Sequence, residues 1–275
     1  MKRIFGPVVA MLVVLALVTL LSLPALAQDE AANPAIIVTA DGITAPEQLA
    51  AGIVTLTFQN DTEARVQSLM VRLNDGKTMQ DFASAMQSGM AGLLATVTLI
   101  GTPVLEPASS VDVIYDLTEG SYVLFVGTTD GPPSQFMLTV SGASDPATEA
   151  PAADVELNLS DTGLELPESV ASGELVWQIA NQSEATPYEF VLYPAEAGAS
   201  VEDAYAAVQA ALSNALGDPS LEPTAPVLHL SPLGPGVSAW VSLDLAPGSY
   251  LVLLQDVGLL TEIAPGMAGM LTVSD

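Results

Sequence analysis

The stretch Val241–Leu254, VSLDLAPGSYLVLL, decides the fold, because an earlier stretch, Val113–Val126, VIYDLTEGSYVLFV, repeats it. In each stretch, alternating apolar residues lead to an Asp-Leu pair, and a Gly-Ser pair then precedes a Tyr that opens a second aliphatic run. Apolar residues that alternate on both sides of a short glycine-containing turn predict a β-hairpin, with the glycine where the turn favours positive φ. The repetition therefore predicts two copies of one β-domain.

The chain upstream of each hairpin repeats as well. Gly52–Asn60, GIVTLTFQN, resembles Gly173–Asn181, GELVWQIAN, and both ends of the two segments are separated by 121 positions. Each segment has the period-two alternation of a strand and ends at an asparagine that is typical of a turn. A further strand follows in each copy, and we match Gln67–Arg72 to Tyr188–Tyr193.

One helix is expected midway through each copy. Thr78 and Asp81 have the spacing of a capping box, and Ser200 and Asp203 repeat it in the second copy. One helix per copy cannot supply the crossovers that a parallel sheet requires, so an α/β fold is excluded. The sequence predicts an all-β protein of two tandem Greek-key β-sandwiches, each with one inserted short helix.

The N-terminus has the pattern of a secretory leader. Lys2 and Arg3 precede an apolar run over Val8–Leu23, and small residues then lead to Ala27. A retained membrane anchor is the alternative. The stretch Ser141–Ala153, SGASDPATEAPAA, has the composition of a linker. We expect a signal peptide over 1–27, a first domain over 28–143, a linker over 144–153 and a second domain over 154–275. The mature chain would then lie outside the membrane, in the periplasm or extracellular space.

Charge and cysteine content exclude several classes of function. The formal net charge is −27, and after the leader only Arg65, Arg72 and Lys77 are basic. Phosphate backbones and anionic lipid surfaces would be repelled, so nucleic acid is excluded as a partner. The acids are scattered, which is typical of a solvated shell, although such a shell also attracts cations or suits a salty or acidic medium. The chain has no cysteine, hence no disulfide and no thiolate chemistry.

The repeat resembles the cupredoxin-like domains of exported bacterial and archaeal proteins. The resemblance rests on the strand from Gly to Asn, the strand after it, the Asp-Leu-x-x-Gly-Ser-Tyr hairpin and, in the second copy, the ending Gly266–Val273, GMAGMLTV. It implies a β-sandwich. Copper-carrying members place a His after the Asn-bearing turn and a Cys four residues past the hairpin Tyr. A second His follows, and then a Met near the C-terminus.

The resemblance places four residues of the second copy at these copper positions. They are Tyr188 for the first His, Leu254 for the Cys, Glu262 for the second His and Met267 for the Met. The first copy offers Gln67 and Val126 at the first two positions. A blue copper site takes its character from a thiolate and two imidazoles. We therefore expect no type 1 copper site and no resident cofactor.

No residue pattern indicates an enzyme. His229 is the only histidine, and as a strand residue it is interpreted as a polar-face side chain rather than as a metal ligand or general base. Met267 and Met270 are interpreted as core packing rather than as a soft metal site, and Trp177 and Trp240 as core anchors. No nucleophile elbow, phosphate loop or zinc spacing is present.

The sequence thus predicts a secreted, non-enzymatic binding or structural module of the cell envelope. Its partner would be an unknown protein or small ligand outside the membrane. A ligand corner is expected where the copper site of the family would lie, formed by Tyr188, Glu189, Glu262 and Met267. The alternative is an envelope protein that handles cations or copper with carboxylate and Met ligands. A hydrolase would require His229 beside an acid and a hydroxyl in one cleft.

Overall fold

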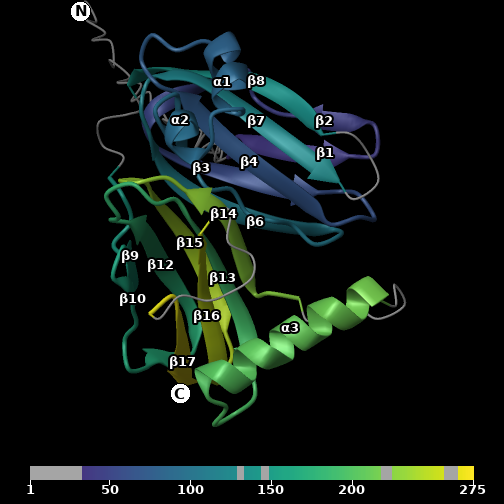
Figure 1. Ribbon diagram of the computed structural model, residues 1–275, viewed down its shortest axis with the longest axis vertical. Helices are drawn as coiled ribbons and strands as arrows, with labels where there is room; N and C mark the ends of the chain where they lie inside the picture. The colour runs from purple at the N-terminus through teal and green to yellow at the C-terminus, as the bar shows by residue number, and fades with distance from the viewer. Residues whose placement is uncertain (1–32, 129–132, 144–148, 218–224, 257–265) are drawn as a thin grey trace, which may run out of the picture. The chain divides into compact units, whose positions relative to one another are not determined.

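The computed structural model describes residues 33–128, 133–143, 149–217, 225–256 and 266–275 (Figure 1). Residues 33–275 form one compact unit. The expected signal peptide lies outside the described residues, and so does part of the expected linker, so both stay predictions. Among the described residues, no helix is long and apolar enough to cross a membrane. Below, residues 33–143 are called the first half and residues 149–275 the second half.

The first half is mostly strand. Its elements are β1 (Ala35–Thr39), β2 (Gly42–Thr44), β3 (Gln48–Asn60), β4 (Val66–Leu73), α1 (Met79–Ala85), α2 (Met90–Leu94), β5 (Val97–Leu99), β6 (Ser109–Leu117), β7 (Gly120–Thr128) and β8 (Ser134–Ala143). The long strand β3 belongs to both layers of the sandwich. Its C-terminal part pairs with β1 and β6, and its N-terminal part pairs in parallel with β8.

The second half has the same order of strands. Its elements are β9 (Val155–Ser160), β10 (Gly163–Glu165), β11 (Val170–Ala171), β12 (Gly173–Asn181), β13 (Tyr188–Ala195), α3 (Val201–Gly217), β14 (Leu228–Leu233), β15 (Ser238–Leu245), β16 (Gly248–Asp256) and β17 (Ala268–Ser274). Here the long strand is split, so that β11 pairs with β17 while β12 pairs with β9 and β15.

Every strand pairing within the first half has a counterpart in the second half. The hairpin β7–β8 corresponds to β16–β17, and the pairing of β4 with β7 corresponds to that of β13 with β16. The parallel pairing of β1 with β3 likewise corresponds to that of β9 with β12. The predicted fold class, all-β with two Greek-key β-sandwiches, is confirmed.

The predicted β-hairpins at Val113–Val126 and Val241–Leu254 are wrong, because the two strands of each stretch do not pair. Strand β6 pairs with β3 and β15, whereas β7 pairs with β4 and β8. Likewise β15 pairs with β12 and β6, whereas β16 pairs with β13 and β17. The short turn instead carries the chain between the two layers of the sandwich, and positive φ occurs at Gly120 but not at Gly248.

The tyrosine after each of these turns has the same structural role in both halves. The hydroxyl of Tyr122 donates a hydrogen bond to the Thr118 carbonyl at 2.8 Å, and that of Tyr250 donates to the Ala246 carbonyl at 2.9 Å. Both rings are buried in the apolar layer between the sheets. A tyrosine can enter a core in this way because its hydroxyl finds a partner at the edge of the core.

The helices agree with the prediction only in part. Thr78 and Asp81 form the expected capping box at the start of α1. The Ser200 hydroxyl accepts from the backbone N–H of Asp203 at 3.1 Å at the start of α3. The first half, however, contains a second short helix, α2, where the sequence predicts only one helix per copy. The conformation of Gly89, with φ of 79°, separates α2 from α1, and no period-based pattern reveals a five-residue helix.

The predicted match between β4 and β13, which pairs Gln67 with Tyr188, is wrong by one residue. The structure pairs Val66 with Leu105 and Tyr188 with Leu233, so Tyr188 corresponds to Val66 rather than to Gln67. The turn that follows Asn181 is one residue longer than the turn that follows Asn60. A shift of one residue in a strand exchanges its two faces. Accordingly Val66 and Tyr188 are both buried, whereas Gln67 is exposed.

The two halves are joined by strand pairing in both layers. In one layer β6 pairs with β15, with Val113 opposite Val241. In the other layer residues 99–105 of the first half run antiparallel to β14, with bridges from Ile100 to Leu233 and from Pro103 to Leu230. We call this second contact the junction. The result is one sheet that runs through both halves, from β10 through β15 and β6 to β5.

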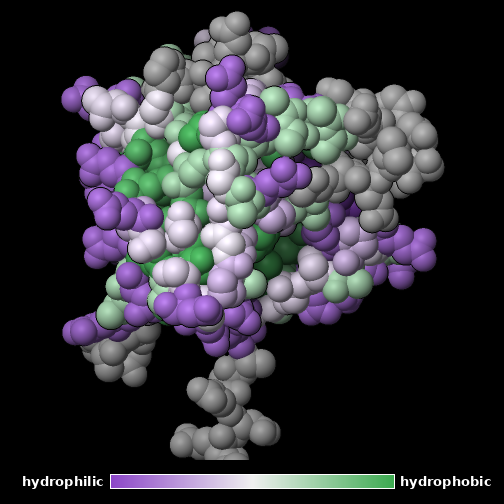
Figure 2. Space-filling model, turned by 90° about the horizontal axis from the view of Figure 1, so that it is seen from below, coloured by the Kyte–Doolittle hydropathy of each residue, from purple (hydrophilic) through white to green (hydrophobic). Residues whose placement is uncertain are grey.

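The surface carries polar side chains around apolar ones. In the view of Figure 2, hydrophilic side chains occupy much of the margin of the face, and hydrophobic side chains are visible between them. Part of the apolar outer surface of the sheets is covered by helices. Ala204 and Val208 of α3 pack on Leu251 and Leu253 of β16. Phe82 of α1 packs in a second such cluster on the first half.

Candidate functional site

A buried asparagine holds a turn at one end of each sandwich, and in the second half this is the end at which the ligand corner was predicted. The Asn60 amide nitrogen donates to the carbonyls of Ala64 and Glu106, both at 2.9 Å. The Asn181 amide nitrogen donates to the carbonyls of Thr186 and Leu233, at 2.9 and 2.8 Å. Each side-chain oxygen accepts the backbone N–H two residues later. These asparagines therefore hold the turn against the neighbouring strand.

In the second half, the structure brings together only some of the residues predicted for the corner. Tyr188 is 2% exposed and belongs to the core between the sheets, and Met267 packs against that same core. Glu189 is next to Tyr188 on β13, so its side chain is on the opposite face of the strand. Glu262 lies outside the described residues. Whether this corner binds a ligand stays a prediction.

In the first half, the corresponding corner borders a hollow of about 860 Å³. Asp41, Asp61, Glu63 and Val126 are among the residues that line it. The Asp61 carboxylate already accepts a hydrogen bond from Gln59 at 2.7 Å. Among the described residues, no group of three or more His, Cys, Asp or Glu side chains is placed to hold a metal ion.

The residues at the copper positions do not fit a type 1 copper ion. Leu254 stands at the position of the thiolate in the second half and is 2% exposed, and Val126 stands there in the first half at 4% exposed. Both are apolar side chains packed in the core, and the sequence contains no cysteine elsewhere to replace them. A thioether alone, from Met267, is the weak ligand of such a site. No electron-transfer step can be derived through copper here.

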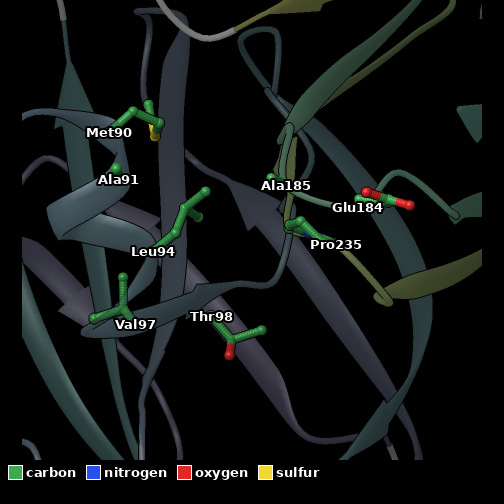
Figure 3. A pocket seen from close by; sticks show the side chains of 9 residues that line it. Met90, Ala91, Leu94, Val97, Thr98, Glu184, Ala185 and Pro235 are labelled. Atoms are coloured by element: carbon green, nitrogen blue, oxygen red, sulfur yellow. The ribbon is translucent and has the colours of Figure 1, made fainter. Parts of the chain in front are cut away.

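A second hollow lies beside helix α2 and has a mostly apolar wall (Figure 3). Its volume is about 550 Å³. Met90 and Leu94 come from α2, while Ala185 and Pro235 come from two turns of the second half. In Figure 3 the Glu184 side chain lies across from Met90 and Leu94, beyond Ala185 and Pro235. This hollow could not be predicted from the sequence, because α2 itself was not predicted.

A group of charged and polar side chains lies on the junction. The Arg65 Nη2 atom is 3.1 Å from His229 Nδ1, and the Arg65 Nε atom is 3.1 Å from Glu106 Oε1. His229 Nε2 faces Glu189 Oε2 at 3.7 Å, which is too long for a hydrogen bond. Tyr193 is near these charges, and burial raises the pKa of its hydroxyl, while the Arg65 charge lowers it. We call Glu106, Arg65, His229 and Glu189 the junction group.

Sequence reasoning named His229 but missed its partners. The interpretation of His229 as a side chain on the polar face of a strand fits its position, since its neighbours Leu228 and Leu230 are in the core. Arg65 is 164 positions earlier in the chain and Glu189 is on another strand. No local pattern connects residues so far apart. The one hint in the sequence is that only Arg65, Arg72 and Lys77 are basic after residue 27, so an acidic surface offers each of them nearby partners.

The methionines and tryptophans largely pack as predicted. Met70 is completely buried, and Met267 and Met270 are partly buried against core clusters. Trp177 and Trp240 are 0% and 7% exposed. Met86 and Met137 are exceptions, because these residues are 62% and 54% exposed.

Comparison with known proteins yields structural similarities alone. No family model matches the chain, and no curated protein matches it. Auracyanin from Roseiflexus castenholzii is 21% identical with a TM-score of 0.30, over 44% of this chain and 96% of the auracyanin. Auracyanin A from Chloroflexus aurantiacus, a blue copper protein, is 21% identical with a TM-score of 0.28, over 43% of this chain and 98% of the auracyanin. The blue copper oxidase from Nitrosomonas europaea is 12% identical with a TM-score of 0.24, over 88% of this chain and 77% of the oxidase. At these scores the similarities carry no argument about activity.

Proposed function

We propose that the chain is an exported, non-enzymatic binding module that uses two copper-free β-sandwiches joined into one body. The observation that carries this proposal is the filling of both copper positions by buried apolar side chains, Val126 and Leu254. The leader-like N-terminus and the acidic composition support a place outside the membrane. The hydrolase alternative finds no support in the junction group, since Arg65 occupies the Nδ1 side of His229 and Glu189 faces the other side.

The hollow beside α2 is the proposed binding site. Pockets of about 300–1,000 Å³ with a mostly apolar wall and a few polar groups are typical of small-molecule sites. This hollow has a volume of about 550 Å³, and Leu94, Val97 and Pro235 are among its apolar wall residues. The Thr98 side chain is the one hydroxyl of the wall. The ligand class is therefore a small, predominantly apolar molecule.

A thermal-shift screen with small apolar compounds tests this proposal. The variant Ala185→Trp places a large ring in the hollow, because Ala185 lines it with an exposed side chain. The matched control is Ala95→Trp, since Ala95 is also exposed but lies at the end of α2 outside the wall. We expect a compound that raises the Tm of the wild-type protein and of Ala95→Trp but not of Ala185→Trp. If no compound shifts the Tm, or if both variants respond like the wild type, the proposal is wrong.

The alternative, a cation- or copper-handling protein, would use the acidic residues that line the hollow at the corner of the first half, Asp41, Asp61 and Glu63. Against it, the described residues contain no group of three acidic side chains placed to hold a metal ion. Calorimetry with calcium, cupric and cuprous ions discriminates the two functions. Heat of binding that disappears in a variant carrying both Asp41→Asn and Asp61→Asn would favour the alternative. The absence of heat and of any Tm shift would exclude it.

A further inference from the structure

The hydrogen-bond chemistry of the junction group determines which nitrogen of His229 carries its proton. A guanidinium has five N–H donors and no acceptor. Because Arg65 Nη2 is 3.1 Å from His229 Nδ1, that nitrogen has to accept, and the imidazole is therefore neutral with its proton on Nε2. The Nε2 atom is buried and has no hydrogen-bond partner. Its nearest acidic oxygen is Glu189 Oε2 at 3.7 Å.

A second proton on His229 changes its partner. Proton uptake places an N–H on Nδ1, directly opposite the N–H groups of Arg65, so two donors and two positive charges face each other. The same proton makes the imidazole a cation beside Glu189, so the contact on the Nε2 side becomes an ion pair. The side chains of His229 and Glu189 are only 10% and 22% exposed, and their interaction is therefore weakly screened.

The two partners belong to different halves of the chain. Arg65 precedes β4 in the first half, whereas Glu189 is on β13, the strand that pairs with the strand of His229. The His229 carbonyl also accepts the backbone N–H of Val104, at 2.8 Å across the junction. A change of partner from Arg65 to Glu189 therefore exchanges a contact between the halves for a contact within the second half.

We propose that His229 is a proton-operated latch of the junction: neutral His229 ties Arg65 of the first half to the second half, and protonated His229 releases it to pair with Glu189. The charged or titratable groups around His229 are Arg65, Glu106, Glu189 and Tyr193. Glu106 holds Arg65 by an ion pair of 3.1 Å and keeps it near the first half after release. Acid would thus loosen the junction without unfolding either sandwich.

The single histidine makes this latch measurable. In the complete chain with ¹⁵N-labelled histidine, every imidazole signal comes from His229. At about pH 8 we expect an unprotonated Nδ1 and a proton on Nε2, and after acidification we expect both nitrogens to be protonated. In the same pH step, hydrogen exchange of the Val104 amide, corrected for its intrinsic pH dependence, should rise about fivefold, the size of one lost hydrogen bond.

Variants separate the latch from a general effect of acid. In Arg65→Gln and in His229→Gln the rise in Val104 exchange should be lost. In Arg72→Gln it should persist, because Arg72 pairs with Asp75 on the first half. Glu189→Gln should move the step to lower pH, since the cation then lacks its counter-charge. A proton on Nδ1 at about pH 8, or an unchanged Val104 step in Arg65→Gln, would overturn the proposal.

Discussion

Gly101 lies so close to Leu233 that a Cβ atom on Gly101 would be 2.6 Å from the Leu233 Cγ atom. The same Cβ would be 3.0 Å from the Ser231 carbonyl oxygen, and the Gly101 φ of 60° is already unfavourable for other residues. Gly101 is on the first half and Leu233 on the second. The close approach of the two edge segments at the junction thus depends on the absence of a side chain at one position.

We predict that Gly101→Ala destabilises the protein by about 2–4 kcal/mol, because the methyl group forces the edge segments apart and positive φ adds strain. Urea unfolding measures the change. Gly76→Ala is the matched control, since Gly76 has φ of 75° but nothing within 4 Å of the added Cβ. This control should lose only about 1 kcal/mol. Equal losses in the two variants would show that the contact with Leu233 contributes nothing.

We predict that Asn181→Ala costs about 2–3 kcal/mol, because it leaves the buried carbonyl of Leu233 and the backbone N–H of Ser183 without their partner. Asn60→Ala should cost a similar amount, since Asn60 binds the equivalent groups. Denaturant unfolding checks both. Asn158→Ala is the control, because Asn158 makes a single exposed hydrogen bond to Gln182 and should change stability by less than about 0.5 kcal/mol.

We predict that Tyr122→Phe and Tyr250→Phe each cost about 1 kcal/mol, since each removes one hydroxyl that donates to the carbonyl four residues earlier. The rings themselves stay in the core. Thermal unfolding of the two variants should give similar decreases in Tm. The control is Tyr205→Phe, which changes a partly buried tyrosine of α3. A large loss in one half and none in the other would contradict the equivalence of the two turns.

We predict that stability falls at alkaline pH because of Tyr115. Burial raises the pKa of the Tyr115 hydroxyl well above its usual value, and this hydroxyl donates to the Gly101 carbonyl at 2.9 Å. The folded protein therefore keeps a proton that the unfolded chain releases above about pH 10. The contribution is fully present below that pH and is lost as the pH rises towards the folded-state pKa. Unfolding in urea between about pH 8 and 11 should show a steeper loss for the wild type than for Tyr115→Phe.

The strands on either side of each Gly-Ser-Tyr turn, the capped helices and the asparagine turns could be predicted because each depends on residues that are near one another in the chain. That these two strands pair with other strands and not with each other could not be predicted, since alternation within a strand does not identify its partner. Gly120, Tyr122 and their equivalents specify a turn and a core position within a few residues. The one-residue slip at Val66 and Tyr188 could not be foreseen, since both strands are apolar enough on both faces to allow either register. Helix α2 is too short to give a periodic signal.

The candidate site was less predictable than the fold. The resemblance directed attention to Tyr188 and Met267, which the structure places in the core. The hollow beside α2 and the junction group both depend on residues from different halves, such as Leu94 with Pro235 and Arg65 with His229. Such contacts depend on how the two sandwiches pack against each other, and the residue pattern within one copy does not predict that packing.

The pairing of β6 with β15 and of residues 99–105 with β14 also covers sheet edges that could otherwise pair with another copy of the chain. A free sheet edge exposes backbone groups that recruit edges of other molecules, and this is a route to aggregation and fibres. Here each half covers such an edge of the other, while the outer strands β2 and β10 are only three residues long. A fragment released by cleavage between the halves would expose both edges at once. We expect that a protease acting there produces insoluble material rather than two independent soluble domains.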